Sequence, residues 1–142
     1  MSREDLSNLL GALIPFAQQV LTERGSFPPF AGTMDAQGQV RGFAAKPEAE
    51  SLPPAELVEL LVESLREAAQ RGECRAGAIC CDVLVAKEAE GEKVSAIAIS
   101  LEAADGTSME CFMPYKKNED GAYDYEEIFG GLVPPRIFVA AP

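Results

Sequence analysis

The sequence of 142 residues contains no histidine. Without histidine the chain cannot form Ser-His or Cys-His nucleophile pairs, and it lacks the commonest side-chain ligand of transition metals. An enzyme built on this sequence would have to transfer protons with Asp, Glu, Lys, Tyr or Cys side chains. We therefore expect a non-enzymatic protein without a bound cofactor.

Basic residues are also scarce. The chain has 12 Lys and Arg against 23 Asp and Glu, a net charge of −11, and its longest basic cluster is the pair Lys116-Lys117. Because phosphate groups would be repelled by such a chain, we expect neither nucleic acid nor an anionic membrane as a partner. The charge is explained either by solubility or by attraction to a basic protein partner.

Long apolar runs are missing, so no segment is suited to span a membrane. The first ten residues, MSREDLSNLL, lack the basic region and the cleavage site of a secretory signal. The length and the 47% hydrophobic content suit one domain with a sizeable core, spanning residues 1–142. These features predict a cytoplasmic protein.

The sequence has no pattern of metal ligands. Its four cysteines, Cys74, Cys80, Cys81 and Cys111, form no CxxC pair, and we expect them to be reduced and mostly buried. The acidic residues near the C-terminus do not have the spacing of a calcium loop; they are Glu119, Asp120, Asp124, Glu126 and Glu127. We predict no metal site and a solvated acidic surface.

The most clearly patterned part of the chain is residues 53–87. An apolar stripe at helical spacing predicts an amphipathic helix that begins at Pro53-Pro54 and ends before Gly72. The stripe consists of Leu57, Leu60, Leu61, Ser64, Leu65 and Ala68. A strand over residues 76–86 follows, and the helix is expected to pack against it.

This strand is apolar on both of its faces. One face carries Ile79, Cys81, Val83 and Val85, and the other is made mostly of small residues such as Ala76 and Ala78. A strand of this kind belongs in the middle of a sheet. We expect an intramolecular helix to cover the small face, with a dimer interface as the alternative.

The remaining elements follow from the same patterns. We predict an N-terminal helical segment over residues 1–24, with a kink or a second helix start at Pro15. We also predict a hairpin around residues 35–38 and strands over residues 93–103 and 108–116. In the terminal segment 118–142 we predict a helical turn over residues 124–129 and a last strand or docked tail over residues 136–141. The fold class is α+β: a single domain with an antiparallel sheet of about five strands, a two-strand hairpin plus a three-strand meander, packed with two main helices in the order α-β-β-α-β-β-β.

Two sets of residues are candidates for a functional site. Asp82 interrupts the apolar strand, which makes it the one candidate catalytic residue. Its alternative role is a structural carboxylate near the strand end that is bonded to Ser100, an Arg or a backbone amide, or that reaches water. Aromatic residues near the first hairpin and near the C-terminal end would line a binding groove if they met at a sheet edge, and otherwise close the core. They are Phe27, Phe30, Phe43, Tyr115, Tyr123 and Tyr125.

Three stretches carry a resemblance to known proteins. GSFPPFAGTMDAQGQV (residues 25–40), REAAQRGECRAGAICCDVLV (residues 66–85) and DGTSMECFMPYKK (residues 105–117) resemble a family of small bacterial proteins whose function is uncharacterised. The order of elements is also similar to two fold families, the roadblock and longin-like regulators and the acidic, dimeric type III secretion chaperones. The resemblance implies a binding module and no catalytic residues.

Together these patterns favour a protein-binding or regulatory module that acts on a protein partner or associates with itself. The first alternative is an acidic chaperone for a basic client. The second is a small-molecule-binding protein or weak hydrolase that uses Asp82, so a small-molecule ligand is not excluded.

Overall fold

The computed structural model describes residues 2–44, 52–86 and 91–138. Its elements are α1 (Ser2–Arg24), β1 (Phe30–Met34), β2 (Val40–Ala44), α2 (Pro54–Gln70), β3 (Ala76–Ala86), β4 (Lys93–Ala103), β5 (Ser108–Lys117), β6 (Tyr123–Tyr125) and β7 (Phe129–Leu132). The α+β class with an antiparallel sheet is therefore confirmed.

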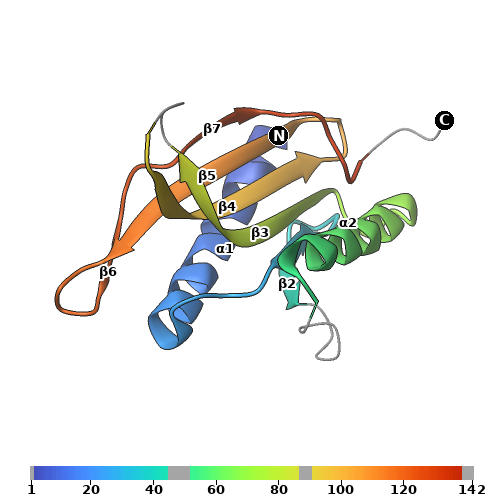
Figure 1. Ribbon diagram of the computed structural model, residues 1–142. Coiled ribbons are helices and arrows are strands. Elements are labelled where there is room, and N and C mark those ends of the chain that lie inside the picture. The colour runs from blue at the N-terminus through green and yellow to red at the C-terminus, as the bar shows by residue number, and fades with distance from the viewer. Residues whose placement is uncertain (1, 45–51, 87–90, 139–142) are drawn as a thin grey trace.

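The molecule has three layers, with α1 on one face of the sheet and α2 on the other (Figure 1). The larger core lies between α1 and the sheet, where leucines of α1 meet Ile97, Ile99 and Leu101 of β4. The smaller core lies under α2 and is built on Ile79 of β3. The small residues of β3, including Ala78, face α1, so the predicted intramolecular helix on that face is confirmed.

Helix α1 runs as one helix through Pro15, so the predicted alternative of a second helix start at this residue is wrong. Proline removes one helical hydrogen bond and crowds the carbonyl four residues earlier, which here belongs to Gly11. Both Pro15 and Gly11 are exposed, so the freed carbonyl lies on the solvent side of the helix, where its cost is small. Buried leucines before and after the proline, such as Leu13 and Leu21, hold both halves of the helix on the sheet.

Within the described residues the strands run in the order β2-β1-β3-β4-β5-β6, and β7 also pairs with β5. Two of the connections are the predicted tight turns, in which Gly38 and Gly106 adopt φ values of 84° and 95° that suit glycine. The strands over residues 93–103 and 76–86 have the predicted bounds. The predicted turn that joins them falls largely outside the described residues.

The C-terminal segment differs from the prediction. Residues 124–129 do not form a helical turn; they contribute to β6 and to the start of β7, which brings the sheet to seven strands within the described part of the chain. The physical reason is the long β5, whose outer edge offers backbone partners to two short segments in succession. Such pairing outweighs a weak local preference for a single helical turn.

The buried side of α2 also differs in detail from the predicted stripe. Leu57, Leu61 and Leu65 are buried as expected, but Val62 takes the place of Leu60, which is 45% exposed. The predicted stripe member Ser64 is exposed as well. Helix α2 is therefore rotated so that the side carrying Val62 meets the sheet.

The described part of the tail docks against the second face of the sheet. Glu102 on β4 is 2% exposed, and one of its oxygens, Oε1, accepts hydrogen bonds from the backbone N–H groups of Arg136, Ile137 and Phe138 at 2.9, 2.7 and 3.2 Å. The side chain of Ile137 is buried in the core under α2. Residues 136–138 are thus a docked tail, and the rest of the predicted last element lies outside the described residues.

Candidate functional site

Among the described residues, no helix covers part of the second sheet face. Helix α2 packs against β1 and β3, while the same face of β4 and β5 continues beside it (Figure 1). The strand register places Cys81, Ala98, Phe112 and Phe129 in one row across β3, β4, β5 and β7. This row, together with Val83, forms the floor that we call the open face.

The floor is apolar and partly exposed. Cys81, Val83, Ala98 and Phe112 are all of intermediate exposure, and the rings of Phe112 and Phe129 stack with centroids 5.5 Å apart. The hollow above the floor has a volume of about 450 Å³ and opens broadly to solvent. A broad, shallow surface of this kind suits a protein segment better than an enclosed small molecule.

One end of the open face is polar. Ser100 Oγ lies 3.4 Å from a guanidinium nitrogen of Arg136, which donates to it, and 3.4 Å from a carboxylate oxygen of Glu110, to which it donates. Burial raises the pKa of the Cys81 thiol to about 11, and the nearby Arg136 opposes this only in part. Cys81 is therefore a protonated, poorly nucleophilic part of the floor at neutral pH.

A second groove of about 490 Å³ adjoins the open face at the start of α2. The two hollows share Val58, Cys81 and Val83. The second groove is lined by Phe27, Pro28, Pro29, Leu52, Pro54, Ala55, Leu57, Val58, Cys81, Asp82 and Val83. It runs between the chain that leads into β1 and the strand β3, and we call it the edge groove.

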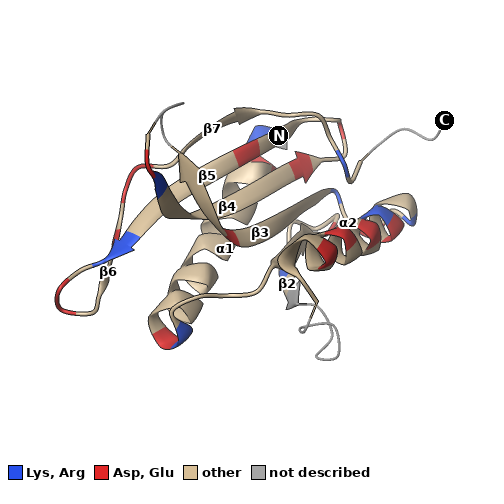
Figure 2. Cartoon of the chain, in the orientation of Figure 1, with Lys and Arg blue, Asp and Glu red and all other residues tan. Residues whose placement is uncertain are grey.

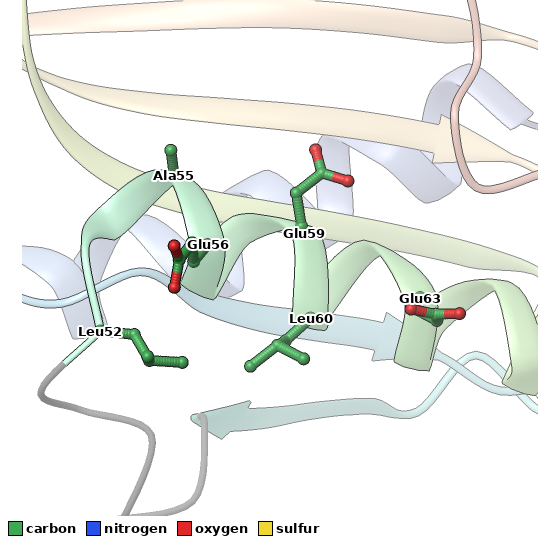
Figure 3. A pocket seen from close by; sticks show the side chains of 6 residues that line it. All are labelled: Leu52, Ala55, Glu56, Glu59, Leu60 and Glu63. Carbon is green, nitrogen blue, oxygen red and sulfur yellow. The ribbon is translucent and has the colours of Figure 1, made fainter.

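A third hollow, of about 320 Å³, lies on the outer side of α2 and shares Leu52 and Ala55 with the edge groove. Figure 3 shows Leu52 and Leu60 pointing toward one another, with three glutamates along the outer side of the helix. They are Glu56, Glu59 and Glu63. The outer side of α2, next to the edge groove, is therefore acidic (Figure 2).

Asp82 is paired with a tyrosine across the intervening strand β4. The hydroxyl of Tyr115 donates to Asp82 Oδ1 at 2.5 Å, on the face of the sheet that α1 covers. Burial, followed by this hydrogen bond and the charge of Asp82, raises the pKa of Tyr115 above its ordinary value. The partner of Asp82 is thus neither Ser100 nor an arginine, and its carboxylate is directed away from the open face.

Some of the predicted aromatic residues line two different hollows, and Phe27, Phe30 and Tyr115 also belong to the same buried core, as the alternative prediction has it. Phe27 and Phe30 are buried and pack edge to face, and Phe27 borders the edge groove. Tyr115 and Tyr123 line a different hollow of about 460 Å³ beside β5 and β6. Tyr125 packs against the same core as these residues, whereas the side chain of Phe43 lies outside the described part of the structure. None of the grooves described above combines the two groups.

The described residues show no group of three or more His, Cys, Asp or Glu side chains placed to hold a metal ion. In the same part of the chain, no helix is both long enough and apolar enough to cross a membrane. The cysteines are all free thiols; Cys74, Cys80 and Cys111 are buried and Cys81 is partly exposed.

The residues of the open face were not singled out by sequence patterns. Cys81 and Phe112 lie 31 positions apart in the chain and become neighbours of Ala98 only through strand register. The one available signal was that β3 is apolar on both faces, which required cover on the second face as well. In the part of the chain that the structure describes, this cover is present at the Ile79 end of the strand.

The fold and the site together define an α+β domain whose antiparallel sheet is covered by a helix on one face and half covered on the other. Comparison of the chain with protein-family models, with curated proteins and with solved structures finds no match.

Proposed function

We propose that the protein is a non-enzymatic, protein-binding module that binds its partner through the open face. The observation that carries this proposal is a row of partly exposed apolar side chains beside α2, which consists of Cys81, Ala98, Phe112 and Phe129. Burial of such a surface by a partner is favourable by about 25 cal/mol for each Å² removed from water.

The chemistry around the open face supports binding rather than catalysis. The chain has no histidine, the Cys81 thiol is held protonated, and the carboxylate of Asp82 is engaged by Tyr115 on the other face of the sheet. A partner would be recognised by apolar contact, with Arg136 and Glu110 fixing its orientation at the polar end.

The experiment is affinity purification of the tagged chain from its source cells, compared with the variants Val83→Asp and Leu132→Asp. Val83 lies on the open face, whereas Leu132 is an equally apolar residue on β7 that is 80% exposed and away from it. We expect one protein at near-equal stoichiometry with the wild type and with Leu132→Asp, and its loss with Val83→Asp. Circular dichroism confirms that both variants fold.

Recovery of the chain without any partner, or a partner that Val83→Asp retains, would contradict the proposal. In the first case, screening for a small-molecule ligand would take its place, because the hollow beside Tyr115 and Tyr123 is lined by hydroxyl and lysine groups.

A further inference from the structure

Strand β3 has an unpaired edge in the middle of the sheet. It runs from Ala76 to Ala86, but its neighbour β1 pairs with it only as far as the Phe30–Cys80 pair. On its other side β3 is paired with β4 along its whole length. Residues 82–86 therefore have no strand beside them on the β1 side within the described residues.

The place where the pairing stops follows from the sequence. Ladder hydrogen bonds in an antiparallel pair alternate along each strand. The N–H of Ala103 on β4 donates to the backbone carbonyl of Thr107, so odd-numbered residues of β4 point toward β5 and even-numbered ones toward β3. The register pairs these even-numbered residues of β4 with odd-numbered residues of β3. The backbone groups of the even-numbered residues of β3 therefore point toward β1. Continuing that register brings Pro28 opposite Asp82. Proline has no N–H to donate, so the ladder ends there.

The backbone N–H and C=O groups of Asp82, Leu84 and Ala86 thus point away from β4 and have no strand partner among the described residues. Leu84 is 67% exposed, so this edge is open to solvent. Exposed strand edges of this kind accept an additional strand from another chain. The edge groove lies directly beside it and offers apolar contacts from Phe27, Leu57 and Val58.

Charge selects the kind of strand that fits. The edge groove and the hollow on the outer side of α2 share residues, and their linings contain no Lys or Arg and four acidic residues, of which Asp82 has its carboxylate held by Tyr115 on the other face of the sheet. Three of these, Glu56, Glu59 and Glu63, lie on the exposed side of α2 (Figures 2 and 3). A second copy of this chain would bring another charge of −11 to the same place, which repulsion disfavours.

We propose that an extended segment of a partner protein, with apolar residues at alternate positions and Lys or Arg at one end, binds as an added strand along residues 82–86 of β3. Its backbone pairs with Leu84 and Ala86, its apolar side chains on the α2 side enter the edge groove, and its basic end reaches Glu56 and Glu59. This inference rests on the proposed function and specifies the chemistry of the partner.

The test begins with a displayed library of random 12-residue peptides selected against the full chain. We expect the selected peptides to alternate apolar residues and to carry Lys or Arg at one end. A synthetic copy of the best peptide is then titrated by fluorescence anisotropy, beside a copy whose alternate backbone nitrogens are methylated. Methylation on the side that faces β3 is expected to abolish binding, because it removes the donors of the added ladder.

The decisive variant is Leu84→Pro, which removes an outward-facing N–H without removing a donor to β4. Its matched control is Leu132→Pro, at the opposite edge of the sheet. The N–H of Val133 donates to the carbonyl of Ser108 on β5, so the N–H of the preceding residue, Leu132, points away from the sheet. We expect Leu84→Pro to weaken peptide binding by at least about tenfold, the cost of one hydrogen bond together with a steric block. Leu132→Pro should leave binding unchanged.

The charge contribution is tested by Glu59→Lys against Glu67→Lys, both on exposed positions of α2. We expect Glu59→Lys to weaken binding of the basic peptide by about fivefold and Glu67→Lys to have no effect at 0.15 M salt. Equal effects of the two variants, or selected peptides without basic residues, would overturn the basic character of the partner.

Three results would overturn the strand-addition proposal itself: a library that yields no binder, peptide binding that Leu84→Pro leaves intact, or self-association in sedimentation that Leu84→Pro abolishes. The last result would identify a second copy of the chain as the occupant. If the partner were lost with Val83→Asp but kept with Leu84→Pro, the proposed function would stand while the site on the β3 edge would be excluded.

Discussion

At the scale of single residues, Glu102 is the clearest case of a charged side chain that determines structure. It is almost fully buried on β4 and its Oε1 accepts three consecutive backbone N–H groups of the tail. Backbone donors that lose their acceptor inside a protein cost free energy, because they have already given up their hydrogen bonds to water. Glu102 therefore holds the tail that carries Ile137 into the core under α2.

We predict that Glu102→Ala lowers the free energy of unfolding by about 1–3 kcal/mol, the cost of leaving these donors unsatisfied. The measurement is urea unfolding followed by circular dichroism. Glu110→Ala is the control, because this residue on the same face is only partly buried and accepts one long hydrogen bond from Ser100. Equal losses in the two variants would show that the contacts to the tail contribute no stability.

At the scale of elements, α2 and β3 behave as the sequence patterns predict, with one rotation of the helix. The predicted stripe contained Leu60, whereas the buried side of α2 contains Val62 instead. Which of them faces inward depends on the angle at which α2 crosses β1 and β3, and that angle is a property of the sheet. The helix itself begins after Pro53 and ends before Gly72, as local signals indicate.

This rotation gives a direct prediction for two neighbouring leucines of α2. Leu61→Ala is expected to lower the free energy of unfolding by about 2–5 kcal/mol, because Leu61 is 3% exposed in the core under α2. Leu60→Ala, on the exposed side, should change it by less than about 1 kcal/mol. Chemical denaturation of both variants decides, and a larger loss at Leu60 would mean that the helix faces the other way.

At the scale of the whole molecule, charge is the dominant feature. A net charge of −11 on 142 residues means that folding brings many carboxylates closer together, and this repulsion opposes the compact state. The row of exposed glutamates on α2 is one visible part of it (Figure 2). The two ion pairs found in the described residues, Arg71 with Glu73 and Arg75 with Asp5, are both partly exposed.

We therefore predict that stability rises with salt. Raising NaCl from about 0.05 to 0.5 M shortens the screening length from more than 10 Å to less than 5 Å and should increase the free energy of unfolding, with most of the gain below about 0.2 M. The double variant Glu119→Gln, Glu127→Gln removes two exposed carboxylates and should gain less. A gain that is equal in both proteins and continues linearly with salt would indicate a general salt effect instead of screening.

The sequence predicted the fold class well and the candidate site poorly. Periodicity identified both helices, the hairpin at Asp35 and the strands β3, β4 and β5, because each pattern acts within a few residues. The short strands β6 and β7 were missed because the Gly130-Gly131 segment has little strand preference of its own and pairs only because β5 offers an open edge. Asp82 was noticed as unusual, but its partner Tyr115 lies 33 residues away and beyond β4.

Local sequence was thus sufficient for the kind of fold, the absence of histidine chemistry and the strongly acidic surface, since each of these depends on composition or on near neighbours in the chain. Tertiary packing was needed to show which half of the second face α2 covers and where β3 lacks a neighbour. Even the role of Pro28 became visible only once the register of β1 against β3 had placed it opposite Asp82. Register and helix placement are collective properties of the assembled sheet, so no local pattern contains them.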